Sequence, residues 1–395
     1  MNGRIRFHGW TDPEDFGGGA HDGTAVRGGV LVLDRATTTR QYVDPHQDRP
    51  PATYDEATWT SPDVVPGFAV TEVIPSWNAV TPSGTWLEVS VAGTTGVGVE
   101  TPWYVLGRWA ETDQDISPAS LSCQKDEHAR VAVDVLTPED GHPFASYRLR
   151  VSLLRRTGST ATPSVSLLGV MGSAVDLGLT PPSSAPGGAA GTVIDVPAYS
   201  QFVHRGRYLE WGGGGEAWCS PTSATMLLEH WGRGPTPDEY AWVDPRLPDR
   251  VVPHAARHTF DHDYRGAGNW SFSTAYAGRY GVRAYVTRLR SLTEMEQFVA
   301  AGIPLAASVS FTRDELHGAG YTTAGHLLTV VGFDADGNVV CNDPAAHQLP
   351  DNAEVRTTFD RTQFACAWQR PTGGIVYVIV PPEVDLPPRP AEANW

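Results

Sequence analysis

Residues 216–232 read EAWCSPTSATMLLEHWG, and this stretch decides the fold of the second half of the chain. Its apolar side chains follow the i, i+3, i+4, i+7 spacing of one face of an amphipathic helix, at Ala224, Leu227, Leu228 and Trp231. Pro221 suits the first helical turn, and Gly232 suits the C-terminal end. The pattern therefore predicts a buried helix with Cys219 at its N-terminal end.

A cysteine in this position has a chemical consequence. The unpaired N–H groups and the dipole at a helix N-terminus favour negative charge, so they stabilise the thiolate of Cys219. A thiol that is merely buried is the alternative, although such a cysteine lies more often inside the apolar face. The preceding glycines, Gly212–Gly215, either let the chain approach a substrate closely or form a flexible loop.

A thiol nucleophile needs a base, and the base needs a group that orients it. Residues 325–333 read GHLLTVVGF, which is typical of a buried strand headed by His326. A turn with an Asp-Gly pair follows at residues 334–338, and the chain returns as VVCNDP at residues 339–344. This hairpin brings His326 and Asp343 towards the same end of two neighbouring strands.

A turn centred on Asp336 would offset His326 from Asp343 by about three residues, or ~10 Å along the strand. A bulge, or a bend before Pro344, must then close that gap. Asn342 is a second candidate for orienting the base, because a side-chain amide can also accept a hydrogen bond from imidazole. A structural histidine at the head of the strand is the alternative to a catalytic one.

Together these segments resemble a papain-like cysteine peptidase. The nearest type is cysteine-peptidase family 39, the bacteriocin-processing peptidases and their stand-alone bacterial relatives. The resemblance covers roughly residues 193–380. It includes VPAYSQ at residues 196–201, which is similar to the family segment that carries a glutamine for the oxyanion hole.

The resemblance implies that Cys219 is the nucleophile and His326 the general base. It also implies that Asp343 orients His326 and that Gln201 binds the oxyanion. The chain departs from the family pattern in two places: Cys-Ser-Pro stands where Cys-Gly-Pro is common, and Gln201 lies unusually far before Cys219. Glu216 or Trp218 is therefore an alternative border of the oxyanion hole.

The first half of the chain is predicted to be all-β. Apolar and polar residues alternate, or apolar residues cluster between turn residues, over five segments: 87–91, 103–109, 131–136, 147–151 and 165–170. Short strands at this spacing predict a β-sandwich over residues 1–180. The whole chain is also similar to actinobacterial proteins described as peptidases of family 39, with WTSP and IPSWNA segments like those at residues 59 and 74.

The remaining boundaries follow from composition. Pro, Gly and Ser dominate residues 181–192, which predicts a linker. A C-terminal α+β domain of papain-like fold is predicted over residues 193–380, with the nucleophile at a helix N-terminus and the His and Asp on antiparallel strands. A Pro-rich tail is predicted over residues 381–395.

Charge and hydropathy limit the partners. The 395 residues carry a net charge of −16, which repels nucleic acid and anionic membranes. No apolar run is long enough for a membrane span. Residues 1–8 lack the apolar stretch of a signal peptide, so we expect either an internal protein or a chain without its native leader, although relatives of this kind are often secreted. No ATPase motif is found either, so the double-glycine leader substrates of exporter-fused relatives are not implied.

Aromatic residues and cysteines in the chain have alternative interpretations. Exposed tryptophans on a sandwich can stack on sugars, but core packing is the favoured interpretation for Trp59, Trp77, Trp86, Trp103 and Trp109. No paired carboxylates there indicate a glycosidase. Cys341 and Cys366 either pair or, as we favour, are buried thiols.

A metal site is a rival interpretation of the second half. His254, His258 and His262 are spaced by four residues and would share one face of a helix. The glutamate that completes the usual zinc-peptidase motif is missing, so we expect neither a metal nor a cofactor.

The sequence thus predicts a cysteine peptidase or amide hydrolase that acts on a peptide or protein through an acyl-enzyme on Cys219. One alternative is a non-catalytic protein that binds cell wall or polysaccharide and has a degenerate papain-like domain. Another is an amidase or transglutaminase-type acyl transferase, since all of these share the acyl-enzyme. Trp270, Tyr276 and Tyr321 are candidates for lining the substrate cleft.

Overall fold

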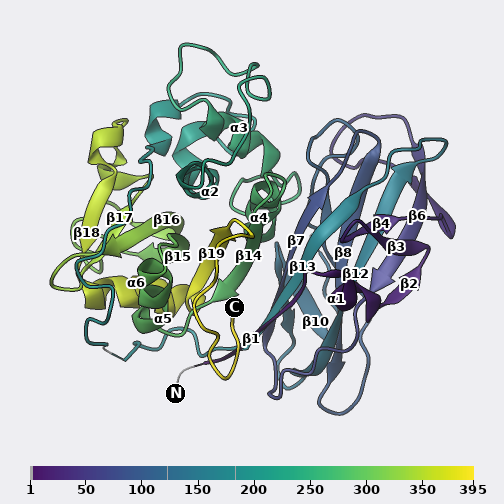
Figure 1. Cartoon of the computed structure of the whole chain (residues 1–395), viewed down its shortest axis with the longest axis horizontal. Coiled ribbons are helices and arrows are strands. Elements are labelled where there is room, and N and C mark those ends of the chain that lie inside the picture. Colours follow the sequence, from purple (N-terminus) through teal and green to yellow (C-terminus); the bar gives the residue numbers. More distant parts are fainter. Residues whose placement is uncertain (1–2, 122, 183) are drawn as a thin grey trace. The chain divides into compact units, whose positions relative to one another are not determined.

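The computed structural model of the chain describes residues 3–121, 123–182 and 184–395. The chain divides into two compact units (Figure 1). The first, called the β-rich unit below, comprises residues 4–174 together with residues 260–265. The second, called the α+β unit, comprises mainly residues 175–259 and 266–395.

Two antiparallel sheets form the β-rich unit. The strands of the first sheet are β1 (Arg4–Trp10), β3 (Thr24–Arg27), β4 (Val30–Leu33), β7 (Glu72–Val80), β10 (Ala129–Ala132), β11 (Val135–Pro138) and β13 (Ser164–Ala174). Their order is β10-β11-β7-β13-β4-β3, and β1 also pairs with β13. The strands of the second sheet are β2 (Ala20–Asp22), β5 (Thr38–Tyr42), β6 (Ala52–Thr60), β8 (Thr85–Thr95), β9 (Tyr104–Trp109) and β12 (Phe144–Arg156). Their order is β2-β6-β12-β8-β9, with β5 on β6.

The two sheets pack face to face through aromatic side chains. Trp10 of β1 and Trp59 of β6 meet edge to face, with ring centroids 5.5 Å apart. The short helix α1 (Pro13–Gly17) also belongs to this core, because the ring centroids of its Phe16 and of Trp59 lie 5.7 Å apart. Four of the tryptophans named above are fully buried, as core packing predicts: Trp59, Trp77, Trp86 and Trp109. Trp103 is partly exposed, and the Arg150 guanidinium lies 3.9 Å from its ring centroid.

The predicted strands agree with the structure over 87–91, 147–151 and 165–170, and β9 covers 104–109. The prediction of one continuous strand over 131–136 is wrong. The chain reverses there, so that β10 and β11 form a tight hairpin with Val131 opposite Leu136. Val133 adopts a positive φ of 58° in the turn, and a β-branched residue gives no sequence signal for that conformation.

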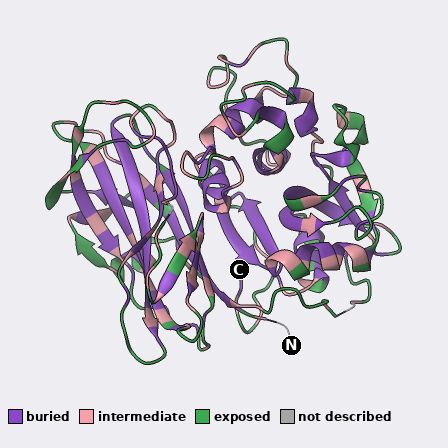
Figure 2. Cartoon of the chain, turned by 180° about the vertical axis from the view of Figure 1, so that it is seen from behind, coloured by how far each residue is buried: buried purple, intermediate pink, exposed green. Residues whose placement is uncertain are grey.

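One six-stranded antiparallel sheet forms the centre of the α+β unit. Its strands are β14 (Arg283–Arg288), β15 (Leu305–Phe311), β16 (Thr323–Phe333), β17 (Val339–Asn342), β18 (Arg356–Phe359) and β19 (Ile375–Val380). They lie in the order β14-β19-β15-β16-β17-β18. Every residue of β19 is buried, and Figure 2 shows the central strands buried beneath more exposed loops. Strands covered on both faces explain the nearly continuous apolar runs in this half of the sequence.

Helices cover both faces of this sheet (Figure 1). They are α2 (Cys219–His230), α3 (Val251–His258), α4 (Trp270–Gly278), α5 (Leu292–Ala300) and α6 (Arg361–Thr372). Helices α2 and α4 share one face, where the Ser220 hydroxyl lies 2.8 Å from those of both Ser273 and Tyr377. Four 3-10 turns complete the unit: η1 (Gln201–His204), η2 (Gly214–Ala217), η3 (Ala346–Gln348) and η4 (Asn352–Glu354).

Helix α2 begins at Cys219, as the sequence predicts, and ends one residue before Trp231. Gly232 follows with a φ of 63°, the left-handed conformation that glycine tolerates best. The helix is less amphipathic than predicted, because Ser220–Leu228 are all buried. Its small polar residues are accommodated by hydrogen bonds such as that from Thr225 Oγ1 to Pro221 O, 2.8 Å.

Two segments of loop-like composition pack against the α+β unit. In the stretch predicted to be a linker, Ser184 O accepts from Arg361 at 2.8 Å, and Gly187 N donates to Glu296 Oε1 at 3.0 Å. In the Pro-rich segment, Trp395 is buried with its ring centroid 5.1 Å from that of Phe298. These contacts hold both segments in place, which composition alone does not predict. Over the described residues, no helix combines the length and the apolar character needed to cross a membrane.

Candidate active site

Cys219 is the first residue of α2, and the structure leaves the N-terminus of that helix without a side-chain cap among the described residues. The preceding residue, Trp218, is fully buried, whereas Cys219 itself is partly exposed. The backbone N–H groups of the first turn are therefore directed at the region of the thiol sulfur. This arrangement favours a thiolate that solvent or a substrate can reach.

His326 lies on β16, which packs against α2. The Ser223 hydroxyl of α2 donates to Leu327 O at 3.2 Å and so fixes the helix against the strand next to His326. On the other side β16 pairs with β15, where Val309 is opposite His326. The imidazole is buried, with 4% of its surface exposed. The helix and the strand thus hold the thiol and the imidazole in a fixed relation.

Asp343 directly follows β17, and its carboxylate is fully buried. Its Oδ1 atom lies 2.7 Å from His326 Nε2 and also accepts from Ala345 N at 2.9 Å. Oδ2 accepts from the Tyr321 hydroxyl at 2.8 Å. The Asp343 carboxylate, and not the neighbouring amide of Asn342, is therefore the partner of the imidazole.

Asn342 has a different set of partners. Its Nδ2 donates to Val196 O at 3.1 Å and to Pro197 O at 3.0 Å, and its Oδ1 accepts from Arg356 Nε at 2.6 Å. The amide thereby holds the segment before Gln201 against the sheet. It does not contact His326, so the alternative of an asparagine orienter is wrong.

The thiol and the imidazole shift each other's protonation. Burial alone would raise the pKa of Cys219, but the His326 charge, its hydrogen bond and the N–H groups of Leu327 and Ser220 together lower that pKa below its ordinary value. Burial would lower the pKa of His326, but the negative charges of Asp343 and Cys219 raise it to about 10. A thiolate–imidazolium pair is the protonation state that these contacts favour.

Gln201 begins η1, and the chain around it is tied to the end of β17. Its backbone N donates to Pro344 O at 2.9 Å, directly after Asp343. Its side-chain Nε2 donates to Glu216 O at 2.8 Å, three residues before Cys219. The Nε2 group therefore has a second N–H besides the one donated to Glu216 O. Among the described residues, Oε1 has no hydrogen-bond partner.

The two alternatives to Gln201 at the oxyanion hole have other partners. The Glu216 carboxylate pairs with Arg205 at 2.9 Å on the surface. The single N–H of the Trp218 indole donates to Trp211 O at 2.6 Å. An ionised carboxylate has no donor, and the indole has no second one. Neither side chain therefore offers the hydrogen-bond donor that an oxyanion needs.

The three residues suggested for a substrate cleft have different environments. Tyr321 contacts His326, with ring centroids 5.6 Å apart. Trp270 is the partly exposed first residue of α4. Tyr276 is buried, and its hydroxyl lies 3.1 Å from the Nδ1 atom of His254, so the prediction that it lines a cleft is wrong.

The sequence did not predict the role of the Leu327 N–H, which helps to lower the pKa of Cys219. No sequence pattern marks a backbone donor.

The histidines proposed as a metal site do not share one helix, as the prediction required. His254 and His258 lie on α3 with ring centroids 4.3 Å apart, but the helix ends at His258. His262 belongs to the β-rich unit, where its Nδ1 atom lies 3.0 Å from Pro118 O. The described residues include no group of three or more His, Cys, Asp or Glu side chains able to hold a metal ion.

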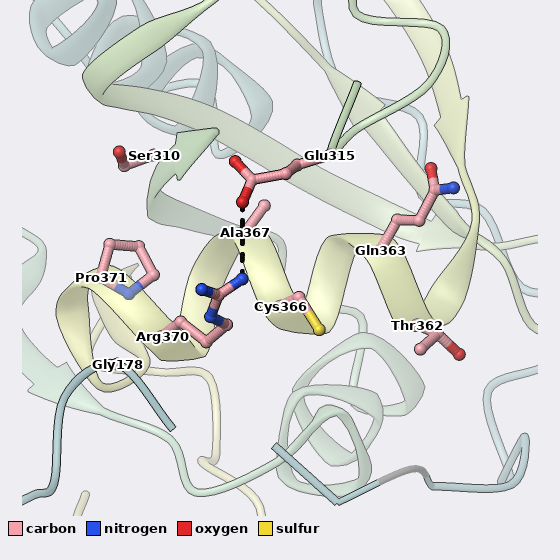
Figure 3. A pocket seen from close by; sticks show the side chains of 9 residues that line it. All are labelled: Gly178, Ser310, Glu315, Thr362, Gln363, Cys366, Ala367, Arg370 and Pro371. Carbon is pink, nitrogen blue, oxygen red and sulfur yellow. Dashed lines mark hydrogen bonds and ion pairs between the residues drawn. The ribbon is translucent and has the colours of Figure 1, made fainter. Parts of the chain in front are cut away.

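A cavity of about 470 Å³ lies beside α6 (Figure 3). It is lined by Gly178, Ser310, Glu315, Thr362, Gln363, Cys366, Ala367, Arg370 and Pro371. Arg370 and Glu315 pair across it at 3.5 Å. The cavity shares no lining residue with the Cys219, His326 and Asp343 cluster.

Cys366 and Cys341 are both free thiols, so they do not form a disulfide.

Two stretches of the chain match known protein families. Residues 193–375 match the Peptidase C39 like family, and residues 6–173 match the Peptidase C39 N-terminal domain. These two matches confirm the resemblance to family 39. No curated protein matches the chain.

Solved structures give only weak similarity. A Bacillus anthracis protein described as a C39-like peptidase is 17% identical, with a TM-score of 0.29, over 47% of this chain and 96% of that chain. Carbohydrate-binding modules of the β-sandwich superfamily are 12% identical, with a TM-score of 0.17, over 42% of this chain and 56% of that chain. Likeness at this level adds nothing to the assignment made by the family matches.

Proposed function

We propose that this protein, a two-domain member of the C39-like peptidases, is a cysteine peptidase or amide hydrolase that uses Cys219 as nucleophile and His326 as general base. The observations that carry the proposal are the 2.7 Å contact between the buried His326 imidazole and the buried Asp343 carboxylate, and the partly exposed thiol at the start of α2, whose pKa the charge and hydrogen bond of His326 lower. We further propose that the α+β unit has a papain-like fold, with the nucleophile at a helix N-terminus and the His and Asp carried by antiparallel strands.

In the proposed reaction, Cys219 is present as a thiolate and His326 as an imidazolium. The sulfur attacks a carbonyl carbon of the substrate, and the oxygen becomes an oxyanion. The amide of Gln201 stabilises that oxyanion together with the Cys219 backbone N–H, each donor contributing about 3 kcal/mol. His326 then protonates the departing amine, and Asp343 stabilises the imidazolium while it is charged.

Deacylation completes the proposed cycle. The neutral His326 takes a proton from a water molecule that attacks the thioester carbon. The carbon–sulfur bond breaks, the acid product leaves, and the thiolate–imidazolium pair is restored. The proton that His326 gives to the departing amine is replaced by the one it takes from water, so this reaction balances without a further group.

Family membership supports a peptide or protein substrate for this reaction. Binding of polysaccharide or cell wall by the β-rich unit stays a prediction. Five of its six tryptophans are buried, and the guanidinium of Arg150 lies over the ring of the sixth, Trp103, so they do not form an exposed platform for sugars. No observation favours the non-catalytic or transglutaminase-type alternatives.

The activity is tested by incubating the protein with a mixture of natural peptides and following new termini by mass spectrometry. Cys219→Ala should abolish cleavage, whereas the matched control Cys366→Ser, which removes a thiol outside the site, should retain it. Equal cleavage by wild type and Cys219→Ala would contradict the proposal. Amine acceptors added to the mixture should not be incorporated, because hydrolysis and not acyl transfer is proposed.

A further inference from the structure

We propose that Tyr321 is a positioning residue of this site: its hydroxyl holds the Asp343 carboxylate in the orientation in which it accepts the hydrogen bond from His326. The inference rests on the proposed function. It adds a fourth side chain to the site formed by Cys219, His326 and Asp343.

The hydrogen bonds of Asp343 show why such a residue is needed. The carboxylate is fully buried, and both donors to Oδ1, His326 Nε2 and Ala345 N, lie at one of its oxygens. The Tyr321 hydroxyl, at 2.8 Å, is the donor recorded for Oδ2. A buried charged oxygen without a donor is costly, and the carboxylate would rotate or shift to regain one. Such a movement would disturb the 2.7 Å contact to His326.

Packing holds the Tyr321 ring in place. The ring meets His326 edge to face at 5.6 Å and Phe311 at 5.2 Å, and 7% of the residue surface is exposed. Burial, followed by the charge of Asp343, raises the pKa of Tyr321 well above its ordinary value. The hydroxyl therefore keeps its proton and remains a donor throughout the range in which the thiolate–imidazolium pair exists.

The backbone before Tyr321 brings it to this place. The loop of residues 312–322 joins β15 to β16, and Gly320 in that loop has a φ of 85°. A Cβ atom at Gly320 would lie 3.1 Å from His347 Nδ1. The glycine thus permits a backbone conformation and a close approach that together bring Tyr321 back over the sheet.

An alternative role for Tyr321 is apolar packing alone, and the hydroxyl distinguishes the two. Tyr321→Phe keeps the ring and removes the donor. The test measures the rate at which iodoacetamide alkylates Cys219 at neutral pH, located by mass spectrometry, so no substrate is required. Four proteins are compared: wild type, Tyr321→Phe, Asp343→Asn and the double variant. Tyr285→Phe is the matched control, because it removes a buried tyrosine hydroxyl from β14 of the same unit.

The proposal expects alkylation to be about tenfold slower in Tyr321→Phe, the loss typical of one hydrogen bond to a charged group. It expects no further loss when Tyr321→Phe is added to Asp343→Asn, because the hydroxyl acts through that carboxylate. Tyr285→Phe should react like wild type. Should Tyr321→Phe not fold, Tyr321→Gln and Tyr321→Met replace it. Their side chains have similar length, but only that of Gln donates a hydrogen bond. Alkylation of Cys219 should then be faster in Tyr321→Gln than in Tyr321→Met.

Two results would overturn the inference while the proposed function stands. One is a wild-type rate in Tyr321→Phe when Asp343→Asn is slow. The other is an effect of Tyr321→Phe that persists undiminished in the double variant, which would place its action elsewhere. A wild-type Cys219 that is not selectively alkylated would instead overturn the proposed function, and this inference with it.

Discussion

The imidazole of His326 and the carboxylate of Asp343 lie 2.7 Å apart because a β-bulge changes the register of the hairpin that joins them. Near the turn Phe333 pairs with Val339 and Gly332 with Val340. Val331 is then unpaired, and Val330 pairs with Cys341. Beyond this bulge Thr329 is opposite Asn342, so Asp343 is level with Leu328, two residues from His326.

The bulge matters because side chains alternate between the two faces of a sheet. Without it, Asp343 would be level with Thr329, an odd number of residues from His326, and the two side chains would lie on opposite faces. The extra residue puts them on the same face. It also frees Val331 O to accept from Ile194 N at 2.8 Å, which fixes the bulge against a neighbouring segment.

Gly332→Ala should therefore disturb both stability and the site. A Cβ atom there would lie 2.2 Å from Thr192 O and 2.6 Å from the Cα atom of Val193, so backbone has to move. We expect a loss of about 1–3 kcal/mol in the free energy of unfolding and slower alkylation of Cys219. Denaturant unfolding and alkylation kinetics measure these effects. Gly188→Ala, where a Cβ atom meets nothing within 4 Å, is the control, and equal behaviour of the two variants would refute the role of the bulge.

Asp343→Asn should reduce peptide hydrolysis by roughly 10²–10⁴-fold, because the amide neither stabilises the imidazolium nor fixes its ring as a carboxylate does. The mixed-peptide assay measures this loss. Asp336→Asn is the control, since that aspartate is exposed in the turn of the same hairpin. Full activity in Asp343→Asn would show that the contact with His326 is only structural.

Gln201→Ala should separate two properties of the site. The oxyanion exists only during acyl transfer, so hydrolysis should fall by about 10²–10³-fold. Alkylation by iodoacetamide forms no oxyanion and should continue at the wild-type rate. Gln363→Ala, in the separate cavity beside α6, controls for loss of a glutamine. Parallel loss of both reactions in Gln201→Ala would indicate that Gln201 supports the local structure instead.

Glu296→Gln should destabilise the α+β unit by about 3–5 kcal/mol, because it leaves the charge of Arg361 buried without its partner. The two side chains lie 2.8 Å apart with at most 9% exposure and bind the segment at Ser184–Gly187. Glu315→Gln breaks an exposed pair with Arg370 and should cost about 1 kcal/mol or less. Denaturant unfolding compares them, and equal losses would contradict a structural role for the buried pair.

Local patterns in the sequence predicted the elements that carry the site. The helix start at Cys219 followed from helical spacing, Pro221 and Gly232, and the hairpin after His326 followed from its apolar run and Asp-Gly turn. Both are local features, each encoded within one continuous stretch of the chain. Gln201 came from the family resemblance alone.

What the sequence did not predict depends on distant contacts. The register of the hairpin predicted a bulge or a bend, but the position of the bulge at Val331 depends on residues 192–194. The turn at Val133 has no glycine or asparagine to mark it. The contacts of Ser184 and Gly187, in the stretch predicted to be a linker, depend on Arg361 and Glu296, far along the chain. The same is true of Tyr321, whose partner Asp343 lies across the sheet. Composition and spacing contain no record of such pairings.

The most direct test of the account is the rate of Cys219 alkylation by iodoacetamide as a function of pH, in wild type and His326→Ala. Because the pKa of Cys219 is lowered and that of His326 is raised to about 10, the pair should form at a lower pH than an ordinary thiolate does and persist to about pH 10. We expect Cys219 to react at neutral pH faster than the exposed Cys123. In His326→Ala burial should raise the pKa of Cys219 and abolish that advantage. Reaction of wild-type Cys219 no faster than Cys123, or unchanged reaction in His326→Ala, would contradict the account.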